Sequence, residues 1–336
     1  MMPTIPLLSV CIATHNRAKF IGETLESIVS QLTDEVEVLV VDGASTDNTG
    51  SIVEKYRLKC PQLKYVYLPV KGGVDQDYDR AVQLAEGEYC WLFTDDDLLK
   101  PGAIISVLDE IKRGYSLIVV NAQVMNRDFT KVLENRLLKI NKNEIYAVSE
   151  TELLFNRVVP YLSFIGGVVI NRGVWMQRDK SRYFGTEFIH VGVIFQAPLP
   201  TAAVVIAEPY ITIRYGNAQW TSRAFEIWMF KWPNLISSFS HISKQAGQEY
   251  QKTRSWGRLK YIITYRAMRA YSLKEYRRWY TTKDSSFCWK LVALLVALMP
   301  VSFVKMVMLI YHKRIKKDAI MTIYNLENDT HNNSNS

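Results

Sequence analysis

Three consecutive carboxylates, Asp95-Asp96-Asp97, form the cluster of this sequence best suited to chemistry. They follow the apolar run 89–93, which predicts a buried strand over 89–97 that ends in acidic side chains. Like charges this close raise one another's pKa unless a cation lies among them. Alternate side chains of a strand share a face, so we expect Asp95 and Asp97 to point together. Such oxygen ligands suit Mg²⁺ or Mn²⁺ bridging a diphosphate; the alternative is a solvated acidic turn.

Two further predicted strands also end in polar residues. These ends carry Thr14-His15-Asn16-Arg17 and Asp42-Gly43-Ala44-Ser45. Ligands of open α/β sheets bind at the carboxyl ends of the strands. A carboxylate at one strand end is more often a helix cap or turn residue, but three such ends at one edge favour a ligand site.

The elements that must position these residues alternate along the first 125 residues. We expect strands over 7–13, 36–43, 64–68, 89–97 and 116–122, and helices over 16–31, 47–58, 74–85 and from Pro101. This alternation predicts a parallel sheet with right-handed crossovers. Further strands are expected over 166–170, 202–208 and 210–215, with helix and loop around 183–196.

Positive charge is concentrated near the C-terminus. The chain carries 41 Lys and Arg against 33 Asp and Glu, and residues 221–320 hold 19 basic and 5 acidic side chains. The apolar stretch 291–311 is interrupted by Pro300 and Lys305, which favours an in-plane or re-entrant membrane anchor over a span. The alternatives are a buried helical subdomain and a surface for single-stranded nucleic acid. Four cysteines without C-x-x-C spacing and a start without signal-peptide features favour the cytoplasm.

Several motif classes are absent from the sequence. No G-x-G-x-x-G follows the first predicted strand, and G-x-x-x-x-G-K-[ST], H-E-x-x-H and C-x-x-C do not occur. These absences count against a dinucleotide-binding dehydrogenase, a P-loop kinase and a zinc site. A nucleotidyltransferase remains an alternative, although we see no Gly-rich, basic phosphate loop near the first strand.

The segments SVCIATHNR, VEVLVVDGASTDNT and LAEGEYCWLFTDDDLLKPGAI occur in this order over about 7–125. Together they resemble the nucleotide-sugar glycosyltransferases of family 2, which have the GT-A fold. Within that family, DYDRAVQLAEGEYCWLFTDDD is most similar to the O-antigen subgroup and its abequosyltransferases. The resemblance is weak over 126–220 and absent afterwards.

The resemblance implies a GT-A-type, Rossmann-like fold: an α/β chain with a mostly parallel sheet flanked by helices. We predict a nucleotide-sugar half over 1–125 and an acceptor half over 126–220. A helical, basic, membrane-associating region over 221–320 and a disordered tail over 321–336 would follow.

The resemblance also implies roles for single residues on the donor side. Thr14 and Arg17 would border the nucleotide, Asp42 would bind its base or ribose, and Asp77 would make a further polar contact. Asp95 would contact the ribose. Asp96 could replace Asp95 or Asp97, because Thr94 occupies the first slot of the usual D-x-D-D pattern.

For the chemical step, the resemblance implies inversion by direct displacement, with Mg²⁺ or Mn²⁺ held by Asp97 and Asp95. Glu187 is our first candidate for the base and Asp179 the second, although a lone Glu is at least as often a surface residue. His190, one helical turn after Glu187, would complete the metal shell or be structural. A diphosphate contact or a salt bridge would equally explain Arg214, which lies near the end of the strand predicted over 210–215.

The implied partners complete the hypothesis. The donor would be a nucleotide sugar, CDP-abequose in the narrower interpretation, and the acceptor a lipid-linked oligosaccharide. The protein would lie at the cytoplasmic face of the bacterial inner membrane, peripheral or monotopic, with no nucleic-acid partner.

Overall fold

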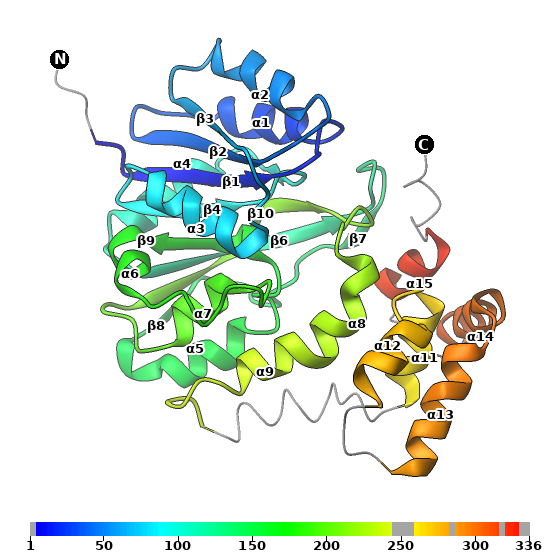
Figure 1. The fold of residues 1–336 in the computed structure, drawn as a ribbon. Coiled ribbons are helices and arrows are strands. Elements are labelled where there is room, and N and C mark those ends of the chain that lie inside the picture. Colours follow the sequence, from blue (N-terminus) through cyan, green and yellow to red (C-terminus); the bar gives the residue numbers. More distant parts are fainter. Residues whose placement is uncertain (1–4, 244–258, 282–285, 316–319, 329–336) are drawn as a thin grey trace. The chain divides into compact units, whose positions relative to one another are not determined.

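The structure, a computed structural model, describes residues 5–243, 259–281, 286–315 and 320–328 (Figure 1). The chain forms two compact units: unit 1 comprises Met1–Arg214 with Phe239–Ser243, and unit 2 comprises Tyr215–Ser238 with Lys244–Ser336. The predicted division at residue 125 falls inside unit 1. Residues 215–220, predicted to belong to the acceptor half, lie in unit 2. There the Tyr215 hydroxyl accepts a hydrogen bond from Asn325 Nδ2 at 2.7 Å.

Unit 1 is built on one sheet of ten strands. Its main path runs β3 (Leu63–Leu68), β2 (Val36–Gly43), β1 (Leu8–Thr14), β4 (Tyr89–Phe93), β9 (Val168–Asn171), β6 (Leu117–Met125), β10 (Ala203–Arg214) and β5 (Leu98–Leu99). Two short strands pair off this path, β7 (Val132–Glu134) with β6 and β8 (Glu144–Tyr146) with β10.

The predicted α/β class with a mostly parallel sheet is confirmed, and a few antiparallel strands are inserted in this sheet. Strands β3, β2, β1 and β4 are parallel neighbours, whereas β9 runs antiparallel to both β4 and β6. An apolar run has the same pattern in either direction, so the sequence of β9 could not reveal its orientation.

Two strand predictions need correction. The strands expected over 202–208 and 210–215 are one strand, β10, whose register shifts between Ile206 and Ile211. Pro209 lies at this irregularity, where its missing N–H removes one ladder hydrogen bond. Strand β4 ends at Phe93, so Asp95, Asp96 and Asp97 lie in the loop before β5 and the alternate-face argument does not apply to them.

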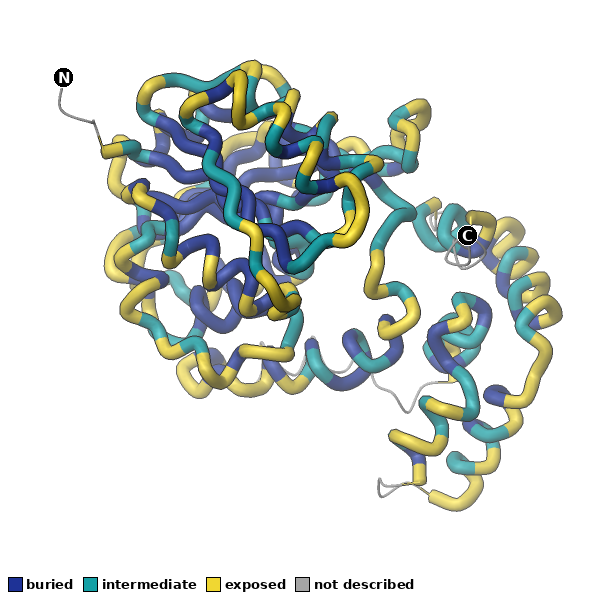
Figure 2. Tube along the Cα trace, turned by 45° about the horizontal axis from the view of Figure 1, so that its top comes forward, coloured by how far each residue is buried: buried dark blue, intermediate teal, exposed yellow. Residues whose placement is uncertain are grey.

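Helices lie on both sides of the sheet (Figure 1). They are α1 (Ile21–Val29), α2 (Thr49–Arg57), α3 (Val74–Leu84), α4 (Ala103–Ile111), α5 (Thr151–Val158), α6 (Arg172–Gln177) and α7 (Ile189–Phe195), with 3₁₀ turns η1 (Val148–Glu150) and η2 (Ile165–Gly167). Helix α3 packs on β1 and β2, and α4 packs on β6 and β10. Every residue of β2 and β4 is buried, as expected of strands covered on both faces (Figure 2).

Unit 2 is helical, as predicted for the described part of 221–320; residues 244–258, 282–285 and 316–319 lie outside the described ranges. Its helices are η3 (Thr221–Arg223), α8 (Ala224–Glu226), the π-helical η4 (Ile227–Lys231), α9 (Trp232–Ile236), α11 (Leu259–Ala267), α12 (Leu273–Trp279), α13 (Phe287–Leu298), α14 (Val301–Arg314) and α15 (Ile320–Glu327). Aromatic rings fill its core, where Phe230 stacks on Trp279 with ring centroids 4.0 Å apart.

The prediction of a disordered tail over 321–336 is wrong for its first part. Residues 321–327 belong to α15, whose Leu326 is buried in a cluster with Val304 and Met308 of α14. The apolar residues of this short segment pack against α14. The polar sequence that follows the segment led to the prediction of disorder. Residues 329–336 lie outside the described part.

Helices α13 and α14 bear on the membrane prediction. Within the described residues, no single helix has both the length and the apolar character that a bilayer crossing requires. The two helices meet that requirement only as a pair, bent by 101° at their junction. The bend follows Met299 and precedes Val301, at Pro300, which the sequence analysis identified as an interruption.

Candidate active site

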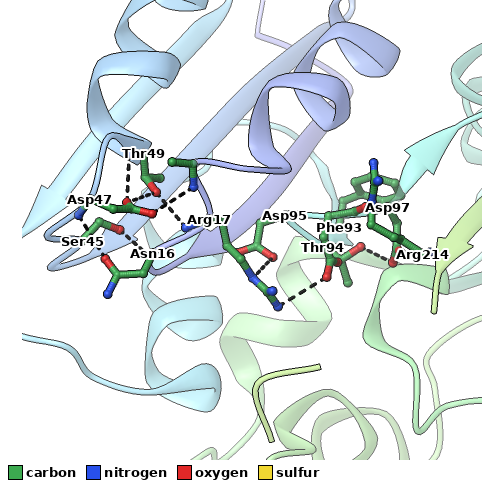
Figure 3. Close-up of polar contacts among 12 residues, drawn as sticks. Asn16, Arg17, Ser45, Asp47, Thr49, Phe93, Thr94, Asp95, Asp97 and Arg214 are labelled. Atoms are coloured by element: carbon green, nitrogen blue, oxygen red, sulfur yellow. Dashed lines mark hydrogen bonds and ion pairs between the residues drawn. The ribbon is translucent and has the colours of Figure 1, made fainter. Parts of the chain in front are cut away.

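The loop Thr94–Asp97 is called the acidic loop below. Arg214, the last residue of β10, holds it by hydrogen bonds (Figure 3). Asp97 Oδ1 accepts a hydrogen bond from the backbone N–H of Arg214 at 2.7 Å, and its Oδ2 accepts one from the Thr94 hydroxyl. The Arg214 guanidinium donates to the Asp96 carbonyl at 2.9 Å and pairs with Glu23. Arg214 thus forms a salt bridge, one of the two roles predicted for it.

Arg17 brings the strand ends of β1 and β4 together. Its Nε lies 3.1 Å from Asp95 Oδ1, and its Nη2 lies 3.4 Å from Asp96 Oδ2 (Figure 3). Thr14, at the end of β1, is the register partner of Asp42 at the end of β2. The prediction that these three strand ends meet at one edge of the sheet is thus confirmed.

Burial changes the protonation equilibria of the acidic loop. Burial raises the pKa of Asp95 to about 6, although the Arg17 charge opposes this shift. Burial, followed by the charge of Asp96, also raises the pKa of Asp97. Burial thus disfavours the charged forms of these carboxylates. Carboxylate oxygens are ligands that Mg²⁺ and Mn²⁺ prefer, and the binding of such a cation by Asp95 and Asp97 remains a prediction.

Asp42 and Asp77 lie at the end of β2, where the donor was predicted. Asp42 is fully buried; its Oδ1 accepts from the Ser45 backbone N–H and its Oδ2 from the Tyr65 hydroxyl, both at 2.8 Å. Asp77, in the first turn of α3, lies so close to Gly43 that a Cβ there would meet its Oδ2 at 2.8 Å. Burial raises the pKa of Asp77. The donor-binding roles of both residues remain predictions.

Two further polar residues hold this edge together. Asp47 accepts hydrogen bonds from the backbone N–H groups of Ala18 at 3.1 Å and Thr49 at 3.0 Å. Asn16, with φ 54°, accepts from the Thr46 N–H at 2.8 Å. An Asn two residues after a strand, a residue type enriched at positive φ, is the sequence signal that could have indicated this role.

Glu187 is half-buried and directly precedes the region of α7. Its backbone N–H donates to Asp75 Oδ2 at 2.9 Å, and Asp75 lies in the first turn of α3 together with Asp77. One helix end thus contacts both the end of β2 and the Glu187 loop. The sequence analysis did not single out Asp75.

The second candidate base lies in a different environment. Asp179 is exposed, and its Oδ1 accepts from the Ser181 N–H at 2.9 Å and hydroxyl at 2.7 Å. These hydrogen bonds lower the pKa of Asp179. A lowered pKa makes Asp179 a weaker proton acceptor, and the roles of Asp179 and Glu187 as candidate bases remain predictions.

His190 requires a correction. It is buried in α7, where its Nε2 donates to the Leu162 carbonyl at 2.7 Å, and burial lowers its pKa to about 4. Among the described residues there is no group of three His, Cys, Asp or Glu side chains able to hold a metal ion. The predicted ligand set of Asp95, Asp97 and His190 is therefore not formed, and His190 anchors α7 in the core.

The fold and the acidic loop define a glycosyltransferase of the GT-A type. Residues 9–164 match the family model described as Glycosyl transferase family 2, and this segment is a domain of that family. The crystal structure of S. aureus TarS 1-349 in complex with UDP shares the fold, with a TM-score of 0.59. It is 19% identical, and the match covers 97% of this chain and 91% of that one.

Two curated relatives extend the comparison. Abequosyltransferase RfbV of Salmonella typhimurium is 24% identical over 296 residues, which are 84% of this chain and 84% of RfbV. A Campylobacter jejuni protein named GalNAc(5)-diNAcBac-PP-undecaprenol beta-1,3-glucosyltransferase is 28% identical over 121 residues. That match covers 36% of this chain and 39% of the relative.

Proposed function

We propose that this enzyme transfers a sugar, with inversion, from a nucleotide donor to a lipid-linked oligosaccharide of the O-antigen type. The observation that carries the proposal is the buried acidic loop at the edge where β1, β2 and β4 end. Arg17 forms ion pairs with Asp95 and Asp96 of this loop. The similarity to RfbV and to the C. jejuni relative, whose printed name includes an undecaprenol-linked saccharide, supports the kind of acceptor.

Each group has a defined task in this scheme. Thr14, Arg17 and the end of β2 would receive the nucleotide, and Asp95 and Asp97 would hold Mg²⁺ or Mn²⁺. The cation, when bound, offsets the charge that develops on the departing nucleoside diphosphate. Glu187 takes the proton of the acceptor hydroxyl. The hydroxyl oxygen bonds to the anomeric carbon as the bond from that carbon to the phosphate oxygen breaks, which inverts the centre.

The narrower donor proposal is CDP-abequose. Its support is the similarity to RfbV, which extends over 84% of both chains and is not confined to the nucleotide half. Purified enzyme incubated with Mn²⁺ and a panel of CDP-, UDP-, GDP- and dTDP-sugars tests it directly. Release of the nucleotide from CDP-abequose alone supports the proposal. Turnover of another nucleotide sugar would instead identify that sugar as the donor.

The first prediction concerns Asp42. The variant Asp42→Ala is expected to raise the donor KM by about 10- to 100-fold, the cost of one hydrogen bond to a charged group. We expect little change in kcat, because a contact remote from the reacting carbon contributes mainly uniform binding. Steady-state kinetics with varied donor measure both constants.

The control for Asp42 is Tyr65→Phe, which removes the hydroxyl bonded to Asp42 Oδ2 and leaves the carboxylate in place. Its donor KM is expected to stay close to that of the wild type. An unchanged donor KM in Asp42→Ala would exclude this residue from the donor site.

We also propose that α13 and α14 hold unit 2 on an anionic membrane surface at the cytoplasmic side. Their exposed apolar side chains include Leu295, Phe303 and Ile310, at 52%, 52% and 51% exposure. The exposed Arg314 and half-buried Lys305 lie on α14 with two of them. Apolar burial and basic side chains together favour an anionic bilayer.

The second prediction tests this surface without disturbing the core. Removing α13 would take Ala293 and Val296 out of the cluster and expose its remaining members, such as Phe225 and Tyr271, so surface substitutions are the better variant. The triple variant Leu295→Ser, Phe303→Ser, Ile310→Ser is expected to bind anionic vesicles roughly 100-fold more weakly, at about 1 kcal/mol for each partly buried side chain. Vesicle co-sedimentation measures the binding, and donor hydrolysis should be unchanged.

The matched control is Leu153→Ser, which removes an apolar side chain that is 58% exposed in unit 1. It should bind vesicles like the wild type. High salt should release only part of the wild-type protein, because salt screens the basic residues but not the apolar contact. Wild-type protein that stays in the supernatant with anionic vesicles at low salt would exclude the membrane proposal.

A further inference from the structure

Asp75 is a buried carboxylate that accepts hydrogen bonds from the backbone of another segment. It lies in the first turn of α3 with 2% of its surface exposed. Its Oδ2 accepts from the Glu187 N–H at 2.9 Å, and its Oδ1 accepts from the Ile189 N–H at 3.0 Å. Both oxygens therefore bind the strip of backbone that carries Glu187 into α7.

The backbone of Glu187 needs such support. Its φ is 72°, in the left-handed region that a glutamate rarely adopts, and such residues persist only where the surroundings hold them. On the N-terminal side, the Thr186 hydroxyl donates to the Tyr183 carbonyl at 2.7 Å and accepts from the Phe188 N–H at 3.1 Å. On the C-terminal side, all residues of α7 are buried.

The burial of Asp75 separates its role from that of Glu187. At 2% exposure, Asp75 has no surface to offer a substrate, whereas the Glu187 side chain is half-buried. The carboxylate of Asp75 thus acts on the backbone of the Glu187 loop. The neighbouring Asp77 contacts the end of β2, so α3 fixes the Glu187 loop relative to the donor edge.

We propose that Asp75 is the positioning residue for the base, holding the Glu187 backbone in the left-handed conformation that directs its carboxylate to the acceptor hydroxyl. This inference rests on the proposed function, in which Glu187 is the base. Misplacement of a reacting group by about 1 Å can cost roughly 100-fold in rate.

Asp79 supplies a matched control on the same helix. It is one turn beyond Asp75 and 5% exposed, and its oxygens accept from Trp175 Nε1 and Gln83 Nε2, both at 2.8 Å. Asp79 thus resembles Asp75 in burial and bonding but joins α3 to α6 instead of to the Glu187 loop. A purely structural role would make the two aspartates equivalent.

The test compares Asp75→Asn, Asp79→Asn, Glu187→Gln and the double variant Asp75→Asn/Glu187→Gln in the full chain. Asparagine keeps the shape, but its NH₂ cannot accept the second backbone N–H. We expect Asp75→Asn to lower kcat for sugar transfer about 10- to 100-fold with the donor KM unchanged. The double variant should be no slower than Glu187→Gln alone, because Asp75 acts only through Glu187.

Thermal unfolding, and binding of CDP and UDP with Mn²⁺ by calorimetry, show whether each variant is folded. Asp79→Asn is expected to lose stability like Asp75→Asn but to keep the wild-type kcat. Wild-type kcat in Asp75→Asn, equal kcat losses in the two aspartate variants, or multiplied losses in the double variant would overturn the inference. Absence of transfer by the wild type from every donor, or full activity of Glu187→Gln, would instead overturn the proposed function.

Discussion

Asp97→Asn is expected to lower kcat on the order of 10²- to 10³-fold, the usual effect of removing one preorganised electrostatic group. The substitution is nearly isosteric. The amide oxygen can still accept from the Arg214 N–H, which lies 2.7 Å from Oδ1, and the amide NH₂ can donate to the Thr94 hydroxyl. The fold of the acidic loop should survive, while the charge that would hold the divalent cation is lost.

The measurement is sugar transfer as Mn²⁺ or Mg²⁺ is titrated into chelator-treated enzyme. Wild-type activity should rise with the cation, and Asp97→Asn should stay low at every concentration. The control Asp109→Asn removes an exposed aspartate of α4 and should behave as wild type. Full turnover by Asp97→Asn in the presence of a chelator would exclude the metal role.

Much of the sheet could be predicted because its strands are buried on both faces. The strand predicted over 36–43 is β2 with the same bounds, since a continuous apolar run that ends in Asp42-Gly43 leaves little choice. The direction of β9 could not be predicted, and the three-residue strands β7 and β8 were missed. Strands that short present too few residues for an alternating pattern to be recognised.

The candidate site was predictable where it depends on strand ends, and not where it depends on long-range contacts. The meeting of Thr14, Arg17 and Asp95 follows from parallel strands in a wound sheet. The Arg17 ion pairs and the bond from Arg214 to Asp97 join residues 78 or more positions apart, which no local pattern encodes. The sequence around each residue therefore gives no indication of its distant partner.

Asp75 was overlooked in the sequence and His190 was predicted as a metal ligand, and in both cases the burial of the side chain was not foreseen. An aspartate in the first turn of a helix is expected for its favourable interaction with the helix dipole, so Asp75 attracted no attention. His190 attracted attention through its residue type and its spacing from Glu187. Burial decides both cases: it makes Asp75 a partner for remote backbone and encloses His190 in the core.

The last prediction separates the two candidate bases. Glu187→Gln is expected to lower kcat roughly 10²- to 10⁴-fold, the contribution of a positioned general base. The donor KM should not change, because the base acts on the acceptor hydroxyl during the chemical step. Transfer to a soluble acceptor, with donor and acceptor varied separately, measures both constants.

The matched comparison is Asp179→Asn, which neutralises the other candidate. Asp179 is exposed, and its hydrogen bonds from Ser181 lower its pKa, so it is a weaker proton acceptor near neutral pH. We therefore expect its kcat to stay within about twofold of wild type, as for most exposed substitutions away from a site. If Asp179→Asn instead lost the activity and Glu187→Gln kept it, the base would be Asp179. The left-handed backbone at Glu187 would then serve only the turn into α7.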